Sequence, residues 1–255
     1  LMKRNNVYVF SSNYTFYGDM SARVMTSLRS IVGEIEVYSI DEAFLDITDF
    51  YYCDLTETAK EIRRLVKQWT GIPISIGIGP TKTLAKVANR QAKKYESSNV
   101  FDIRGESERV EVLKDLELED IWGISTRWGR RLRKIGIQNA YDLSTGNPRQ
   151  IRKALSIVGE RIHYELNGKS CIQVEEVKNK KNIISSKSFG KKVTKVQELE
   201  EAVSMYTARA CEKLREQGSR AQGIYVFLRT SPYLEEENKY SNGMSSYFDI
   251  PTSNT

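Results

Sequence analysis

The stretch "VYSIDEAFLDIT", residues 37–48, places two adjacent acids, Asp41 and Glu42, inside an otherwise apolar run. The flanking segments "EIEVYSI" (34–40) and "EAFLDIT" (42–48) read as two successive strands, which leaves at most a two-residue turn at Asp41-Glu42 or one residue to either side. Two-residue hairpin turns favour Asn-Gly or Asp-Gly, so Ile-Asp-Glu-Ala is poor turn chemistry. A local rule broken in this way is typical of functional sites.

Adjacent carboxylates at the end of a strand become favourable when a divalent cation binds between them. Mg²⁺ prefers a few carboxylate oxygens together with substrate phosphates and water. Two such ions can activate a hydroxyl and stabilise the leaving oxygen in phosphoryl transfer. An Asp-Glu pair is also common in ordinary exposed turns, so the neighbouring segments must decide between these two interpretations.

A second segment, "SIGIGPTKTLAKVANRQAKK" (75–94), reads as a strand, a Gly-Pro turn and a helix. Lys82, Lys86 and Lys93 fall along one side of this helix, and a helix N-terminus attracts phosphate. The alternative interpretation is a stripe of solvated surface lysines.

A third segment, "IWGISTRWGRRLRKIGI" (121–137), reads as a glycine-containing turn that leads into a basic helix. Residues 121–153 hold eight Lys or Arg and one acid, Asp142, whereas residues 1–104 hold 14 basic and 12 acidic residues. This local charge indicates a polyanionic partner, and the pattern is that of a helix-hairpin-helix that grips a sugar-phosphate backbone. A plain αα-hairpin with a basic face is the alternative.

Composition excludes several other classes. The chain has 255 residues, a net charge of +6, one histidine (His163) and three dispersed cysteines. A Ser-His triad, a histidine-based metal site and a disulfide framework are therefore not expected, and the thiols fit a reducing cytoplasm. Apolar runs of about 20 residues are missing from the sequence, so no membrane span is expected.

The order of the expected elements divides the chain into three parts. Residues 1–104 read as α/β, with strands at 5–12, 34–40, 42–48, 73–79 and 100–103 and helices at 19–32, 56–70 and 81–94. Residues 106–171 read as all-helical, with breaks at Gly123, Gly136 and 146–148. A charged linker follows, then "IISSKSFG" (183–190), a helix at 196–217, the strand 223–230, a polar hairpin at 233–243 and the segment 244–251.

These motifs together resemble the Y-family of translesion DNA polymerases. "YSIDEAFLDIT" and "GIGPTKTLAKVANRQAKK" are similar to the two palm motifs of that family, whereas "SSNYTFYGDMSARVM", "IISSKSFGKKVT", "TARACEKLREQ" and "FLRTSPY" are similar to its UmuC-like branch. The resemblance implies a multidomain α/β and α+β fold. It comprises a partial palm with a βαβ-type mixed sheet (1–104), a small helix-hairpin-helix thumb (105–172), a linker (173–182) and a truncated α+β little finger (183–255).

The resemblance also implies roles for individual residues. Asp41 would ligate two Mg²⁺ ions, Glu42 would bind the catalytic ion and help to position the primer 3′-hydroxyl, and Lys93 would contact the nucleotide triphosphate. The residues expected to contact DNA are Lys82, Lys86, Gly123, Ile124, Ser125, Arg127, Arg130, Arg131, Lys187, Ser188, Lys191 and Lys192. The last four would lie on the first strand and turn of the little finger.

The chain also departs from the family pattern. The strand that carries a third metal-binding Asp, the steric gate and the fingers are expected before Leu1, and further little-finger elements are expected after Thr255. Ser125 stands where the thumb hairpin is expected to carry a second glycine, which weakens its backbone grip. We therefore expect this fragment to bind primer-template DNA without polymerising, with Mg²⁺ bound weakly or not at all, and to expose an apolar face of the little-finger sheet.

The intact protein is expected to be a bacterial, cytoplasmic, nucleoid-associated polymerase of the SOS response that uses deoxynucleoside triphosphates. The resemblance implies a UmuD-like dimer, RecA and a sliding clamp as protein partners. One alternative is a non-catalytic DNA-binding or regulatory module with a vestigial palm. A cyclic-dinucleotide cyclase is another, but Tyr38-Ser39-Ile40 stand where such enzymes need Gly-Gly before the acidic pair.

Overall fold

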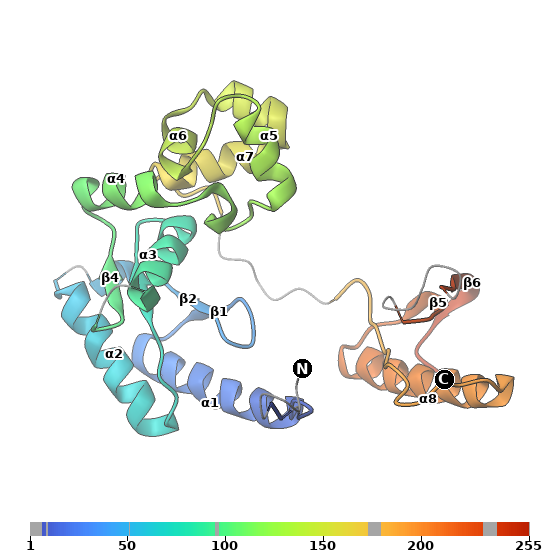
Figure 1. The fold of residues 1–255 in the computed structure, drawn as a ribbon. Helices are drawn as coiled ribbons and strands as arrows, with labels where there is room; N and C mark the ends of the chain where they lie inside the picture. Colours follow the sequence, from blue (N-terminus) through green and yellow to red (C-terminus); the bar gives the residue numbers. More distant parts are fainter. Residues whose placement is uncertain are drawn as a thin grey trace. The chain divides into compact units, whose positions relative to one another are not determined.

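The computed structural model describes residues 7–8, 10–50, 52–94, 97–172, 180–231 and 239–254. Contacts divide the chain into two compact units, residues 1–176 and 177–255, each described here by itself (Figure 1). The division falls inside the linker expected at 173–182, most of which lies outside the described residues. None of the described helices combines the length and the apolar character that crossing a membrane requires.

The first unit begins with an α-helix and a β-hairpin that share a core. Helix α1 (Tyr14–Val32) packs beside α2 (Leu55–Thr70), and β1 (Ile35–Val37) pairs antiparallel with β2 (Ala43–Leu45). The alternating residues of both strands, Ile35, Val37, Ala43 and Leu45, pack on the buried faces of α1 and α2. The opposite face of the hairpin therefore presents the side chains between them, Glu36 and Phe44, because successive residues of a strand point to opposite faces.

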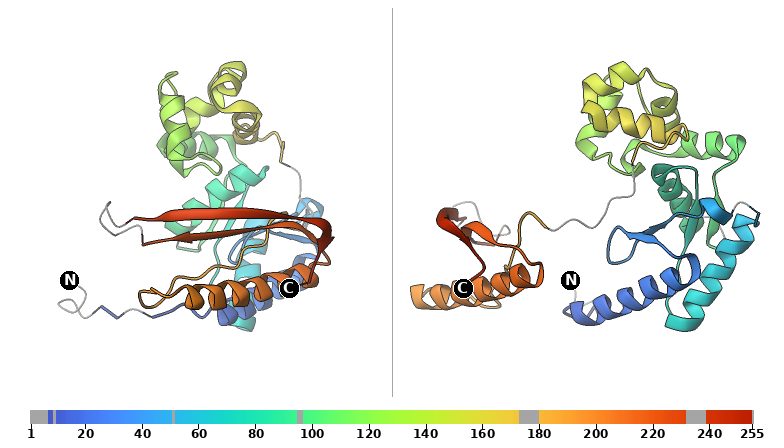
Figure 2. Two further views of the ribbon diagram at one scale, coloured as in Figure 1. Left: turned by 90° about the vertical axis from the view of Figure 1, so that its right-hand side faces the viewer. Right: turned by 180° about the vertical axis from the view of Figure 1, so that it is seen from behind.

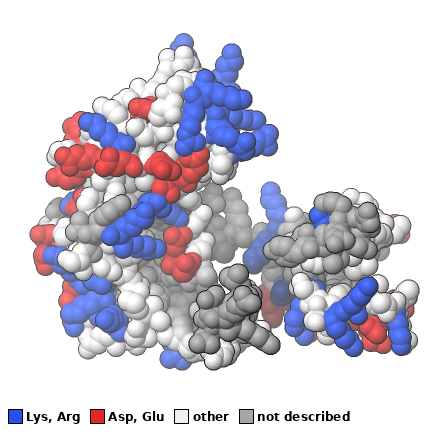
Figure 3. Space-filling model, in the orientation of Figure 1, with Lys and Arg blue, Asp and Glu red and all other residues white. Residues whose placement is uncertain are grey.

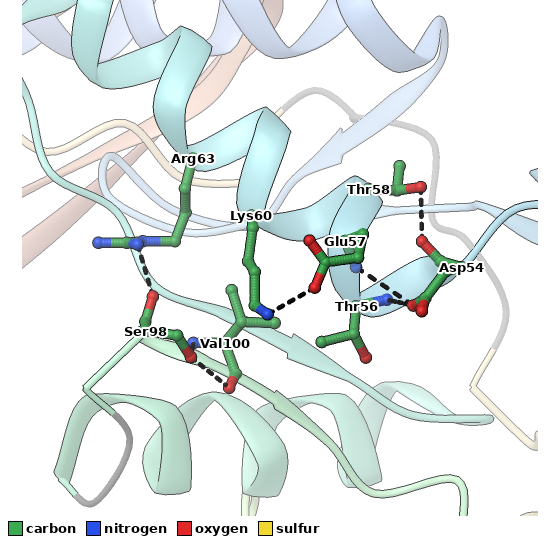
Figure 4. Close-up of polar contacts among 8 residues, drawn as sticks. All are labelled: Asp54, Thr56, Glu57, Thr58, Lys60, Arg63, Ser98 and Val100. Atoms are coloured by element: carbon green, nitrogen blue, oxygen red, sulfur yellow. Dashed lines mark hydrogen bonds and ion pairs between the residues drawn. The ribbon is translucent and has the colours of Figure 1, made fainter.

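Helix α2 is fixed at its start and along its length by polar contacts (Figure 4). The Asp54 carboxylate caps it, accepting hydrogen bonds from the amides of Thr56 (2.8 Å) and Glu57 (3.2 Å). Further along, the Arg63 guanidinium donates to the carbonyls of Ile74 and Ser98, one before β3 and one before β4. A single arginine thus fastens the helix to the loops that lead into both strands.

A parallel strand pair lies between α2 and a basic helix. Strand β3 (Ile76–Ile78) pairs with β4 (Val100–Asp102), and α3 (Lys82–Lys94) connects them. Ile78 and Val100 pack with Ala59 of α2, whereas a Cβ on Gly77 would lie 2.0 Å from the Asn89 amide of α3. Gly77 therefore permits α3 to pack closely against β3. In this position, lysines of α3 reach the neighbouring hairpin.

Residues 105–172, which the resemblance implies to be a thumb and which are called the thumb below, are helical, as the sequence predicts. It contains α4 (Glu106–Asp115), a 3-10 turn (Leu118–Asp120), α5 (Thr126–Arg133), α6 (Ala140–Thr145) and α7 (Pro148–Leu166), which has a non-helical residue at Ser156. Gly123 and Gly136 take positive φ at the breaks around α5. The thumb core is continuous with the apolar face of α3, so thumb and basic helix form one packed body.

The second unit holds one helix and one strand pair among its described residues. Helix α8 (Val196–Glu216) lies alongside β5 (Ala221–Arg229) and β6 (Ser241–Thr252), an antiparallel ribbon (Figure 2). The Arg215 guanidinium and the Cys211 thiol of α8 donate to the carbonyls of Ser253 and Asn254 just after β6. One face of the ribbon is an open apolar groove lined by Ile224, Val226, Leu228 and Met244. Among the described residues of this unit, this face is uncovered, in agreement with the expectation from the sequence.

Several expected strands differ in the structure. The two strand pairs of the first unit are separate rather than one mixed sheet. Residues 183–190 form no strand, because β5 and β6 pair only with each other within the described chain, and Ile184 stays 69% exposed. The described part of the strand expected at 5–12 (residues 7–8 and 10–12) is not a strand either, and the rest lies outside the described residues.

Candidate active site

The acidic turn is a five-residue loop, Tyr38–Glu42, rather than the two-residue turn expected from the sequence. The Glu42 carbonyl accepts hydrogen bonds from the amides of both Tyr38 and Ser39, at 3.0 Å each. The Ser39 hydroxyl donates to Asp41 Oδ1 (2.6 Å) and accepts from the Asp41 amide. Because the loop has five residues, Asp41 and Glu42 do not have to fit a tight two-residue turn. The loop holds both acids immediately before the start of β2.

The loop presents its two carboxylates differently. Asp41 is exposed, whereas the Glu42 side chain is 32% exposed and its Oε2 accepts a hydrogen bond from Lys86 Nζ at 2.9 Å. Both acids offer the hard oxygen donors that Mg²⁺ prefers. One oxygen of each carboxylate already has a partner in the chain: Asp41 Oδ1 accepts from the Ser39 hydroxyl, and Glu42 Oε2 accepts from Lys86. The residues therefore fit two of the ligands of a magnesium site, and no group of three potential ligands forms within the described ranges.

The hairpin face opposite the core meets two lysines of α3. Lys82 pairs with Glu36 and Lys86 with Glu42, which places both cations against this strand pair. Lys86 Nζ also lies 4.3 Å from the Tyr38 ring centroid and 5.2 Å from that of Trp122. Lys82 and Lys86, expected to contact DNA, therefore interact with carboxylates of their own chain.

Tyr38, Phe44 and Trp122 form an aromatic cluster that joins the hairpin to the thumb. Their ring centroids are 5.4–5.9 Å apart, and the Trp122 indole donates to the Tyr38 hydroxyl at 3.0 Å. Trp122 immediately precedes Gly123, so this cluster fixes the start of the thumb loop beside the acidic turn. Arg90 of α3 adds an ion pair to Asp120.

The N-terminus of α3 is already capped from within the chain. The Thr83 amide donates to Glu165 Oε2 at 3.1 Å, and the Leu84 amide donates to the Thr81 hydroxyl. The carboxylate of the thumb thus takes the place that a substrate phosphate would take at this helix end. Lys93, the expected triphosphate contact, is exposed at the other end of α3.

The thumb loop offers fewer free amides than the sequence suggests. The Ile124 amide donates to the Ile121 carbonyl at 3.0 Å, and its side chain is buried in the thumb core. The Ser125 hydroxyl caps α5 through the Trp128 amide. Gly123, with φ of 90°, and Ser125 are both exposed, and phosphate contact by this loop stays a prediction.

The basic helix α5 gives the thumb a positive surface. Arg127, Arg130 and Arg131 are exposed, and Lys and Arg side chains gather over this part of the thumb (Figure 3). Arg133, in contrast, forms two hydrogen bonds of 2.6 Å with Glu119, which lower the pKa of the Glu119 carboxyl. The first three arginines are therefore the cations of α5 that face solvent.

The four residues of the second unit that are expected to contact DNA are exposed. They lie in the irregular segment before α8 rather than on a strand: Lys187, Ser188, Lys191 and Lys192.

Three important side chains were not identified from the sequence. Tyr38 and Trp122 form the cation-binding aromatic pair, and the fully buried Glu165 links the thumb to α3. The aromatic residues beside the acidic motif and before Gly123 were a usable signal. Glu165 gave none, because a glutamate near a helix end usually reads as solvated.

Comparison with known proteins supports the assignment of both units. The impB/mucB/samB family matches residues 1–90, and the C-terminal domain of the same family matches residues 180–255. Together the two matches cover more than half of the chain.

Individual relatives agree with this match. Protein UmuC of Salmonella typhimurium strain LT2 is 41% identical over 254 residues, and Protein SamB of Salmonella typhimurium is 39% identical over 254 residues. Each alignment includes 98% of this chain and 60% of the relative, so the chain spans about three fifths of the length of these curated relatives. A solved Y-family DNA polymerase chimera, Dbh-Dpo4(243-245)-Dbh, has 23% identity and a TM-score of 0.65, covering 96% of this chain and 68% of that one. The chain therefore belongs to the UmuC-like impB/mucB/samB family and has a Y-family DNA polymerase fold.

Proposed function

We propose that this chain supplies the carboxylate turn and part of the DNA-holding surface of an error-prone translesion DNA polymerase. The observation that carries the proposal is the Tyr38–Glu42 loop, which holds Asp41 and Glu42 beside a lysine-bearing helix and the thumb loop. Bound Mg²⁺ would supply Lewis acidity for nucleotidyl transfer. The chain would orient its Asp41 and Glu42 carboxylates toward the ions, Glu42 beside the primer 3′-hydroxyl, with Lys93 near the triphosphate.

The proposed substrates are primer-template DNA and deoxynucleoside triphosphates. The SOS setting, the UmuD-like dimer, RecA, the sliding clamp and a cytoplasmic, nucleoid-associated location belong to the same proposal and rest on family membership. The non-catalytic alternative, a DNA-binding module with a vestigial palm, predicts DNA binding without synthesis in every form of the protein.

Primer extension tests the catalytic part of the proposal. The 255-residue chain and a version extended to the full length of its relatives are each given primer-template DNA, Mg²⁺ and four deoxynucleotides. We expect templated extension from the longer version only, because the described residues supply two carboxylates rather than three. Extension by neither would favour the non-catalytic module, and extension by the short chain would show that two carboxylates suffice.

Salt dependence tests the DNA-holding part. Replacing Arg127, Arg130 and Arg131 together by Gln is expected to weaken primer-template binding about tenfold or more and to reduce the slope of log K against log salt by about 2–3. These arginines are exposed, so the fold should be retained. Fluorescence anisotropy over a salt series measures both quantities.

A matched control removes a cation that already has a partner. Arg64→Gln on α2 breaks an exposed pair with Glu61 and should leave the slope within about 0.5 of the unmodified chain. Equal slopes for the triple variant and the parent would contradict phosphate contact through α5.

A further inference from the structure

Lys86 is held by three groups at once in the middle of the candidate site. Its Nζ donates to Glu42 Oε2 at 2.9 Å and lies over the rings of Tyr38 (4.3 Å) and Trp122 (5.2 Å). Lys86 is a residue of α3, Glu42 and Tyr38 belong to the hairpin loop, and Trp122 belongs to the thumb. One ammonium group therefore connects the three elements around the acidic turn.

We propose that Lys86 is the internal cation of Glu42, a positioning residue that holds this carboxylate before a divalent ion binds and that must leave it when the ion arrives. The inference rests on the proposed function, which makes Glu42 a metal ligand. It gives Lys86 a role inside the chain in place of the DNA contact expected from its position on α3.

The Lys86 ammonium and a divalent ion would compete for the Glu42 carboxylate, because both are positively charged. In the ion pair, the positive charge of Lys86 lies beside one oxygen of the Glu42 carboxylate. The divalent ion would bind the same carboxylate. Two cations on the same side of one carboxylate repel each other, and the repulsion is strong where water is partly excluded. A lysine can withdraw, because its ammonium group is carried on a flexible four-carbon stem.

The neighbouring pair of the same helix shows why Lys86 is the exchangeable cation. Lys82 and Glu36 are each 11% exposed, so their ion pair is largely closed to solvent. Lys86 and Glu42 are 22% and 32% exposed, which leaves an approach from solvent to the carboxylate. The structure thus combines one closed pair that holds the hairpin against α3 with one open pair beside the turn.

Withdrawal of Lys86 has a consequence at the thumb. The ammonium lies over both Tyr38 and Trp122, and a cation over an aromatic face is attracted by the ring electrons. When Lys86 leaves Glu42, its position over the two rings changes as well. Occupation of the acidic turn by a metal ion should therefore alter the environment of Trp122, immediately before Gly123.

Metal affinity is the first measurement. Binding of Mn²⁺ alone to the 255-residue chain is followed by the loss of the free Mn²⁺ electron paramagnetic resonance signal. Lys86→Met is expected to bind Mn²⁺ about fivefold more tightly than the parent chain, because the competing ammonium group is removed. This change corresponds to about 1 kcal/mol of binding free energy. Lys86→Arg keeps a cation in place and should retain the parent affinity within about twofold.

The matched control is Lys94→Met, which removes the same charge from an exposed position of the same helix. Its Mn²⁺ affinity should stay within about twofold of the parent, because a solvated charge at that distance is screened. Circular dichroism of each variant checks that the fold is retained.

The second measurement separates exchange from simple repulsion. The chain is labelled with 5-fluorotryptophan, which gives one ¹⁹F signal for each of its three tryptophans, and Trp122→Phe assigns the one of interest. Ca²⁺ is then added, because it is diamagnetic and takes oxygen ligands. We expect the Trp122 signal to shift while those of Trp69 and Trp128 stay. In Lys86→Met the Trp122 signal should start displaced and no longer respond.

The outcomes distinguish this inference from the function on which it rests. Mn²⁺ binding that is lost in Glu42→Gln but is equal in Lys86→Met and the parent would overturn the role of Lys86 and leave the metal site intact. A Trp122 signal that ignores Ca²⁺ while Mn²⁺ binds would also overturn it. If neither the parent nor Lys86→Met bound Mn²⁺, the exchange at Lys86 would be overturned for this chain, whereas the proposed function would still be decided separately, by primer extension with the longer version.

Discussion

Asp41→Asn is expected to abolish templated synthesis while leaving DNA binding almost unchanged. The substitution keeps the size of the side chain and leaves an oxygen to accept the Ser39 hydroxyl, which now donates to Asp41 Oδ1 at 2.6 Å. What it removes is the negative charge that would neutralise the metal ions. Metal-held charge stabilisation is worth several kcal/mol, so the expected loss of rate is about 1,000-fold or more.

The measurement uses the version extended to the length of the relatives, with single-nucleotide incorporation under excess enzyme and anisotropy for DNA affinity. Asp46→Asn is the matched control, since it makes the same change in the same hairpin. Asp46 instead accepts hydrogen bonds from Thr48, which lower the pKa of its carboxyl. Its rate should stay within about threefold of the parent, because its carboxylate lies outside the acidic turn. Equal losses in the two variants would mean that Asp41 supports only the local fold.

The helices of this chain could be predicted because their signals are local. The helix expected at 56–70 forms as α2, and the Asp54 carboxylate caps its start. The long helix expected at 196–217 forms as α8, and the glycine breaks around α5 take the positive φ that favours glycine. The start of α1 was placed five residues late, because Asn13 caps a first turn whose aromatic side chains are exposed and show no periodic pattern.

Strand pairing was predicted less well because it depends on partners far along the chain. The pairing of 34–40 with 42–48 was correct, but the loop between them is longer, since the Glu42 carbonyl and the Ser39 hydroxyl close it with hydrogen bonds that the pattern does not reveal. The strand expected within residues 183–190 was implied only by the resemblance to the Y-family. A strand needs a neighbour to satisfy its backbone groups, and the described residues provide none there.

The acidic residues of the candidate site could be singled out from the sequence, but the contacts that join the site to other elements could not. Asp41 and Glu42 are recognisable from a motif, whereas the contacts of Lys86 arise between residues 44 and 36 positions apart. A lysine at helical spacing reads equally well as a solvated side chain, a phosphate contact or an internal ion pair. Only the packing of α3 against the hairpin decides among these interpretations.

The largest stability effect is expected at Glu165, at the junction of thumb and α3. This side chain is fully buried, and its carboxylate accepts hydrogen bonds from the amides of Thr83 (3.1 Å), Cys171 (2.6 Å) and Ile172 (3.0 Å). Its own carbonyl accepts the Thr81 hydroxyl at 2.8 Å. Glu165→Ala leaves three backbone amides without their acceptor, so the free energy of unfolding should fall by about 3–5 kcal/mol.

Tryptophan fluorescence in a urea titration measures this loss for the first unit alone, because all three tryptophans lie within residues 1–176. Glu111→Ala, at an exposed position of α4, should change the free energy of unfolding by less than about 0.5 kcal/mol. Glu165→Gln retains one acceptor oxygen but turns an amide N–H₂ toward backbone donors, so its loss should fall between those two values. A Glu165→Ala midpoint equal to that of Glu111→Ala would contradict the assignment, because the carboxylate satisfies one buried amide (Thr83) and two half-buried amides (Cys171 and Ile172), and its removal should be costly. The same variant should also loosen α3, since its first turn loses its cap, and with it the placement of Lys86 beside the acidic turn.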